Sequence, residues 1–295
     1  MKNIIISGAT GFIGSHLSQH LKTKGFNVVP ISRKEFKMQP KAFLDFLSGS
    51  DAVINLAGAP IVKRWTKKYK NELIASRLFT TRKLAQSIAL MPDKPAIFIS
   101  VSAVGIYDDK GIKKENDNIT AEHFLSRLCV DWEHEALAAA AHTKVAICRM
   151  GLVLGHNGGL VKKLMPVFKK GLGGPIGSGK QVLSWIHIED VVQAFVHVLE
   201  NKLDGVINFT APYPVSNKEF TKAFARVLKK PAFFMVPSFL LRMVFGEAAF
   251  VLTHGQNVYP QRLIESAYEF QFAHIDNALS EAAKQEMPPH TGKTS

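Results

Sequence analysis

Short apolar runs alternate with amphipathic segments along the first half of the chain. The apolar runs have the length of buried strands and end at glycine or polar residues; they cover residues 3–7, 27–32, 51–58, 95–103 and 144–155. The segments between them carry apolar residues at helical spacing and cover residues 14–25, 40–49, 67–90 and 120–141. This alternation predicts an α/β fold, a doubly wound parallel sheet with helices on both faces and right-handed crossovers.

Three glycines follow the first predicted strand directly. Gly8, Gly11 and Gly14 stand three residues apart within the stretch SGATGFIG. The first permits a tight turn, the second lets the backbone approach a phosphate, and the third lets the helix pack on the strand. The start of the following helix offers free N–H groups and a positive dipole end to a pyrophosphate. The pattern therefore predicts dinucleotide binding; a purely structural glycine turn is the alternative.

The pattern changes after residue 155. Glycine-rich loops precede an amphipathic helix at 187–201 and a strand at 205–211, and helices separated by prolines follow. We expect a ligand to lie between two parts of the chain. The expected division is a Rossmann-type dinucleotide-binding domain (1–155 with 182–210), a smaller, mostly helical substrate lobe (156–181 with 211–285) and a disordered tail (286–295).

The G-x-x-G-x-x-G spacing resembles that of the extended short-chain dehydrogenases/reductases, a superfamily that includes sugar-nucleotide epimerases and dehydratases. NLAG at 55–58, SVSAVGIY at 100–107 and SWIHIEDVV at 184–192 resemble its further motifs. Longer stretches, among them CVDWE and GQNVYPQRLIESAYEF, are similar to an atypical subgroup labelled epimerase family protein, and this likeness covers nearly the whole chain. The resemblance implies a cofactor site made by Gly8, Thr10, Gly11, Phe12, Ile13, Gly14, Ser32, Arg33, Leu56, Ala57, Gly58, Ser100 and Val101.

The residues after the second strand select the dinucleotide. An acidic side chain there would bind the ribose 2′-OH of NAD and repel a 2′-phosphate. The chain has Ser32, Arg33 and Lys34 instead, and an arginine binds phosphate through two charge-assisted hydrogen bonds. We therefore expect NADP(H) rather than NAD(H). A solvated arginine is the alternative reading. The acidic side chain of Glu35 keeps NAD(H) as the alternative cofactor.

The tyrosine–lysine pair of this superfamily is missing. The family carries Y-x-x-x-K on a helix, where the tyrosine is the general acid or base and the lysine lowers its pKa. None of the five tyrosines of this chain has a lysine four residues later. With Glu133 aligned to a glutamate that follows the family's lysine, the two positions hold Leu125 and Cys129. Neither side chain can replace the pair.

Three residues are candidates to take over the chemistry. Ser102 holds the family's hydroxyl position, and Tyr107 is expected on a loop over the nicotinamide; a packed loop tyrosine is the alternative. Arg77 stands where extended members often have an asparagine, and its charge would favour a developing oxyanion.

Four residues are candidates for substrate binding. Arg64, Trp65 and Lys70 follow the third strand within a basic cluster and are expected to bind an anionic substrate; a solvated basic face is the alternative. His187 is a further candidate, although a structural role is the commoner one for such a histidine.

Composition limits the remaining classes of protein to which the chain could belong. Apolar residues make up 46% of the 295 residues, and no apolar run reaches the ~18 that predict a membrane span. Two cysteines and the absence of a signal-peptide pattern favour a reducing cytoplasm. The eleven histidines form no ligand cluster, so no metal is expected. The net charge of +13 fits a small phosphorylated ligand, or simply a cationic surface; no nucleic-acid-binding motif accompanies it.

Two functions remain open. The first is an NADP(H)-binding, epimerase- or dehydratase-like oxidoreductase acting on a small carbonyl or alcohol that is phosphorylated or nucleotide-linked. The second is a catalytically silent NADP(H)-binding sensor. The resemblance also makes a homodimer plausible.

Overall fold

A six-stranded parallel sheet forms the centre of the computed structural model, which describes residues 2–156 and 158–284. The strand order is β10-β6-β4-β3-β1-β2, and every neighbouring pair is parallel. The strands are β1 (Asn3–Ser7), β2 (Asn27–Ile31), β3 (Ala52–Asn55), β4 (Ile97–Ala103), β6 (Lys144–Met150) and β10 (Gly205–Phe209). The doubly wound Rossmann-type fold is thereby confirmed.

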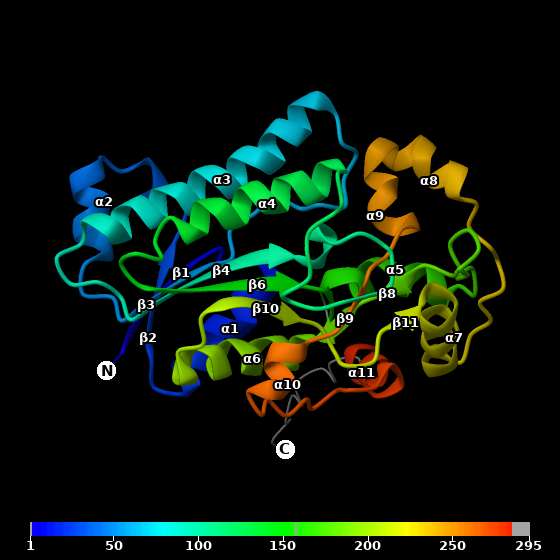
Figure 1. Cartoon of the computed structure of the whole chain (residues 1–295). Helices are drawn as coiled ribbons and strands as arrows, with labels where there is room; N and C mark the ends of the chain where they lie inside the picture. The colour runs from blue at the N-terminus through cyan, green and yellow to red at the C-terminus, as the bar shows by residue number, and fades with distance from the viewer. Residues whose placement is uncertain (1, 157, 285–295) are drawn as a thin grey trace, which may run out of the picture.

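Helices cover both faces of this sheet (Figure 1). Successive residues of β1 point to opposite faces, so Ile4 and Ile6 join one core cluster and Ile5 joins another. The first cluster is closed by α1 (Phe12–Thr23) and α6 (Ile188–Asn201), and the second by α2 (Pro40–Leu47), α3 (Lys67–Leu90) and α4 (Phe124–Leu137). Strands buried on both faces need continuous apolar runs, which explains the pattern of the sequence.

The predicted strand at 144–155 is wrong in one respect, because it is two strands. β6 ends at Met150, and β7 (Leu152–Leu154) pairs with β9 (Trp185–His187) outside the main sheet. Gly151 lies between them, where a Cβ atom would come 2.7 Å from the Ser184 carbonyl oxygen. The chain can therefore leave the sheet only at a residue without a side chain. The helix predicted at 120–141 is also shorter, since His123 caps it and Phe124 begins it.

Short helices and two-stranded ribbons make up most of the rest of the chain. The helices are α5 (Gly159–Lys169), α7 (Asn217–Leu228), α8 (Ser238–Phe245), α9 (Phe250–Thr253), α10 (Gln261–Glu265) and α11 (Ile275–Ala282). The ribbons pair β8 (Val182–Leu183) with β11 (Val215–Ser216) and β5 (Ile112–Lys113) with β12 (Asn257–Val258). Figure 1 shows α8 and α9 at one end of the molecule, beyond the ends of α3 and α4.

Several expectations from the sequence, on domain boundaries and cellular location, stay predictions. β10 completes the sheet beside β6, but the domain boundaries themselves stay a prediction. The expected tail at 286–295 lies outside the described residues. Within the described ranges, no helix has both the length and the apolar character required to cross a membrane. Both cysteines are free and buried, and the cytoplasmic location inferred from them stays a prediction.

Candidate functional site

The three glycines form a tightly packed cradle between β1 and α1. Gly8 has φ +72°, and a Cβ atom there would come 2.9 Å from the carbonyl carbon and oxygen of Leu56. A Cβ on Gly14 would lie 2.2 Å from the Gly8 carbonyl oxygen, whereas one on Gly11 would lie 3.2 Å from it. Gly8 therefore brings β1 against the end of β3, and Gly14 brings α1 against the turn, as the motif requires.

The start of α1 is open to an anion. Gly11 is the N-cap without a side-chain hydrogen bond, and no acidic residue stands in the first turn. Thr10 and Gly11 are exposed, and Ile13 is half-buried. The ring of Phe12 packs over Gly158, where a Cβ would come 2.0 Å from it. The uncovered N–H groups and the helix dipole thus form an anion site, and this cradle fits a dinucleotide diphosphate.

The end of β2 carries a second group of donors. Arg33 is exposed, and Ser32 beside it donates from its backbone N–H (2.7 Å) and its hydroxyl (2.5 Å) to Oε2 of Glu35. These hydrogen bonds lower the pKa of the Glu35 carboxyl. The Glu35 carboxylate occupies both Ser32 donors, which leaves the exposed guanidinium of Arg33 as the group that could bind an added phosphate on the adenosine ribose.

Arg77 of α3 lies beside the loop that follows β3, which is expected to border the cofactor. Leu56 and Ala57 are half-buried there and Gly58 is exposed. The buried guanidinium of Arg77 lies against Gly58, because a Cβ on that glycine would come 3.1 Å from Cζ. It donates to the carbonyl oxygens of Ala59 (2.9 Å) and Leu73 (3.2 Å). Burial lowers the pKa of this guanidinium from its ordinary value.

Two hydroxyls at the end of β4 are buried and have no hydrogen-bond partner among the described residues. They belong to Ser100 and Ser102, which flank the half-buried Val101. A buried hydroxyl without a partner costs about 1–3 kcal/mol, so it is a natural place for a ligand. Burial raises the pKa of the nearby Cys129 thiol to about 12, against the opposing effects of the Arg77 charge and of the adjacent Ser102 side chain. Cys129 is therefore neutral at pH 7, and Arg77 is the fixed cation beside it.

Leu125 fills the tyrosine position of the missing pair. A Cβ on Gly105 would come 2.5 Å from its Cδ2 atom, so the leucine packs directly onto the turn after β4. The side chain carries no proton that chemistry could use. The two positions of the usual pair are thus occupied by an apolar contact and a neutral thiol.

The structure contradicts the expected place of Tyr107. Its side chain is 1% exposed rather than open over a cofactor. Its hydroxyl accepts from Nη1 of Arg149 (2.7 Å) and lies 3.0 Å from Oδ1 of Asn208. Arg149 in turn donates to both carboxylate oxygens of Glu133. Burial raises the pKa of Tyr107, so it is a neutral member of a packed polar network.

The structure also contradicts the placement of His187 on a substrate. The ring is 2% exposed, caps α6 through Nδ1 and the Glu189 N–H (3.3 Å), and packs 4.0 Å from the ring of Phe272. Burial lowers its pKa to about 4. These contacts favour the structural role, which is the alternative reading, although its Nε2 is buried without a partner among the described residues.

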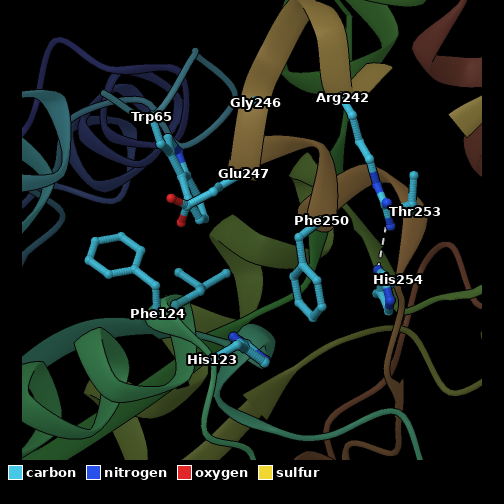
Figure 2. Close-up of a pocket in the computed structure, with 10 residues that line it drawn as sticks. Trp65, His123, Phe124, Arg242, Gly246, Glu247, Phe250, Thr253 and His254 are labelled. Atoms are coloured by element: carbon cyan, nitrogen blue, oxygen red, sulfur yellow. Dashed lines mark hydrogen bonds between the residues drawn. The ribbon is translucent and has the colours of Figure 1, made fainter. Parts of the chain in front are cut away.

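A pocket of about 450 Å³ lies between the start of α4 and the α8–α9 segment (Figure 2). Trp65 lines it, as does Leu125 at the position of the family's tyrosine. Lys70 lines a neighbouring pocket of about 290 Å³ and forms an ion pair with Glu247. Arg64 is directed elsewhere, since it donates to the Met243 carbonyl oxygen at 2.9 Å.

Sequence reasoning missed the far wall of this pocket. Arg242, Phe250, Thr253 and His254 line it from the C-terminal segment. They follow Trp65 by more than 170 residues, and no short motif joins them to it. The described residues include no group of three or more potential metal ligands.

Residues 4–209 match the model of the NAD dependent epimerase/dehydratase family. The chain belongs to that family. Residues 236–282, which include α8 and α9, match a domain of unknown function, DUF1731. The resemblance inferred from the glycine spacing and the later motifs is thereby confirmed.

Several relatives of this epimerase/dehydratase chain cover nearly its whole length. The chloroplastic SDR39U1 homolog of Arabidopsis thaliana is 36% identical over 94% of this chain and 85% of its own. Human SDR39U1 is also 36% identical, and a crystal structure of it with NADPH superposes with a TM-score of 0.88 over 95% of this chain and 99% of that one. A nucleoside-diphosphate sugar epimerase from Corynebacterium glutamicum is 28% identical, with a TM-score of 0.77 over 95% of this chain and 58% of its own.

Proposed function

We propose that this epimerase/dehydratase family member is an NADP(H)-dependent oxidoreductase acting on a small carbonyl or alcohol. One observation carries the proposal. The glycine cradle follows β1, the exposed Arg33 follows β2, and the unpaired Ser102 hydroxyl belongs to the last residues of β4, so all three lie at the carboxyl ends of the strands. Ligands of open α/β sheets bind at this edge. The crystal structure of the human relative with NADPH supports the choice of cofactor.

The residues that would hold the cofactor fall into three groups. The α1 start would bind the diphosphate, Ser32 and Arg33 would bind the 2′-phosphate, and the loop at Leu56–Gly58 would border the dinucleotide. A bound nicotinamide supplies or accepts a hydride ion, and this chemistry belongs to the cofactor.

The chain's own residues would stabilise the reacting oxygen. The Ser102 hydroxyl would donate a hydrogen bond to a substrate carbonyl oxygen. The charge of Arg77, held against Gly58, would favour negative charge that develops on that oxygen. This is a weaker arrangement than a tyrosine–lysine pair, so we infer slow turnover and a simple hydride transfer in place of epimerisation.

A silent NADP(H)-binding sensor is the second candidate. Leu125 and Cys129 favour it, because both positions of the usual pair are filled by buried, non-ionised side chains. A sensor would keep the cofactor site and lose the need for a proton donor.

The turnover of carbonyl compounds by the native protein and by the Ser102→Ala variant distinguishes the oxidoreductase from the sensor. We expect purified protein to oxidise NADPH with at least one member of a panel of aldehydes and ketones, and Ser102→Ala to lose at least tenfold in kcat with unchanged NADPH affinity. Ser50→Ala is the matched control, since Ser50 is also buried and unpaired but precedes β3 at the opposite edge. Tight NADPH binding without turnover of any compound would favour the sensor.

We also infer a homodimer through α3 and α4. These helices expose apolar side chains on their outer faces, with Phe79 53% and Leu137 46% exposed. Such exposure on adjacent helices is typical of an interface. Light scattering after size exclusion should give twice the chain mass for the native protein and a monomer for Phe79→Glu; a monomeric native protein would end this inference.

A further inference from the structure

Most polar groups of the pocket beside Leu125 already have partners. Glu247 pairs with Lys70, and the Nε1–H of Trp65 donates to the Ile61 carbonyl oxygen at 2.9 Å. Nδ1 of His123 accepts the Ser126 N–H at 3.2 Å. These contacts hold the walls in place and leave few groups for recognition of a ligand.

Two groups are exceptions. Nε2 of His123 is buried without a partner among the described residues. Arg242 lines the pocket with an exposed side chain, and no ion pair or hydrogen bond to another described residue engages its guanidinium. Figure 2 shows the side chain directed toward Thr253 and His254. The Thr253 hydroxyl donates to the Ala249 carbonyl oxygen (3.0 Å) and so accepts from Nδ1 of His254 (3.0 Å). A guanidinium beside an imidazole, without a carboxylate between them, can donate charge-assisted hydrogen bonds to an anion that enters the pocket.

Both sides of the pocket carry aromatic rings. The ring of Trp65 packs 5.2 Å from the ring of Phe124, and Phe250 stacks 4.1 Å from the ring of His254. Because the Trp65 N–H is already used, only the face and edge of its indole can contact a ligand. These rings suit a flat apolar body.

The walls of this pocket offer few groups that could bind a sugar. Sugar hydroxyls donate as well as accept, and they need carboxylate or amide oxygens that are free. Glu247 is the one carboxylate among the residues that line the pocket, and Lys70 occupies it. The pocket thus offers donors and rings, but few acceptors.

We propose that this pocket binds a flat, apolar organic anion, such as an aromatic carboxylate that also bears the reacting carbonyl or hydroxyl group, with Arg242 and His254 on the anionic group and Trp65 and Phe124 on the body. This inference rests on the proposed function, because it names the substrate class of that enzyme. It replaces the expected phosphorylated or nucleotide-linked substrate, and it moves the anion contact from Arg64 and Lys70 to the C-terminal wall.

Calorimetric titration with matched probes tests the proposal. The probes are 2-naphthoate, 2-naphthyl phosphate, the neutral 2-naphthamide and glucose 1-phosphate, each titrated into cofactor-free and NADPH-saturated protein. We expect 2-naphthoate to bind at least tenfold more tightly than 2-naphthamide and glucose 1-phosphate. Arg242→Gln should remove that preference. Tighter binding of 2-naphthyl phosphate than of 2-naphthoate would assign the site to aryl phosphates and overturn the carboxylate.

Arg226→Gln is the matched control, since Arg226 is an exposed arginine of the same part of the chain that pairs with Asp276 away from the pocket. It should bind the probes like the native protein. Equal affinity for 2-naphthoate and 2-naphthamide, or full affinity in Arg242→Gln, would overturn the proposal. Failure of the proposed function shows separately, either as absent heat on addition of NADPH or as NADPH binding without turnover of any compound, since the probes are also measured without cofactor.

Discussion

Gly14 approaches Gly8 so closely that a Cβ atom added to it would lie 2.2 Å from the Gly8 carbonyl oxygen. The corresponding distance for Gly11 is 3.2 Å, a contact that a small shift relieves. The same motif therefore holds one glycine that the packing of α1 on β1 requires and one that faces the expected diphosphate.

Replacement of Gly14 by alanine should destabilise the protein and weaken NADPH binding together. The added methyl group must push α1 away from the turn, and such overpacking costs about 1–3 kcal/mol. Urea unfolding and NADPH calorimetry measure the two effects. Gly11→Ala is the comparison, with near-native unfolding free energy expected; a Gly14→Ala protein as stable as Gly11→Ala would contradict the packing.

Removal of the Arg33 side chain should weaken NADPH binding ~10- to 100-fold, because a hydrogen bond to a charged group contributes about 1.5–3 kcal/mol. NADH lacks the 2′-phosphate, so its affinity should not change in Arg33→Ala. Calorimetry with both dinucleotides measures the ratio. Arg127→Ala removes another exposed arginine and serves as control. Equal losses for NADPH and NADH would show that Arg33 does not read the phosphate.

The Tyr107→Phe variant should lose stability without losing the cofactor site. The change leaves an Nη1–H of Arg149 and Oδ1 of Asn208 without the hydroxyl, at a cost of about 1–3 kcal/mol. Thermal unfolding should show a lower Tm, and NADPH affinity should stay native. A variant with native Tm and no turnover would restore Tyr107 as a catalytic residue.

His187 should make the protein less stable as pH falls from 6.5 to 4. Burial lowers the pKa of His187 to about 4, so the unfolded chain takes up a proton in this range that the folded chain does not. The free energy of unfolding then falls with decreasing pH, by about 3 kcal/mol for this histidine. Glu281 favours the charged ring and His16 opposes it.

Urea unfolding at pH 7, 6, 5 and 4 measures the slope. His187→Asn keeps a side chain that can cap α6 and should show a smaller decrease. His142→Asn replaces an exposed histidine and should follow the native protein. The same slope for His187→Asn and the native protein would exclude His187 as the titrating group.

The sequence predicted the sheet, the phosphate cradle and the bounds of α3 because these depend on neighbouring residues. Continuous apolar runs specify strands buried on both faces, and the glycine spacing acts within one turn. The family label followed from the same local motifs. Arg77 was named as a candidate from the sequence, its contact with Gly58 required the structure, and its catalytic role stays a prediction.

Only the tertiary structure decided which side chains meet. The Tyr107 hydroxyl contacts Asn208, 101 residues away, so the side chain is buried although the residue lies on the expected loop. Arg242 and His254 reach the pocket of Trp65 because the C-terminal segment packs beside the start of α4. A sequence pattern reports the environment along one element, whereas a binding site depends on the packing of elements that are far apart in the chain.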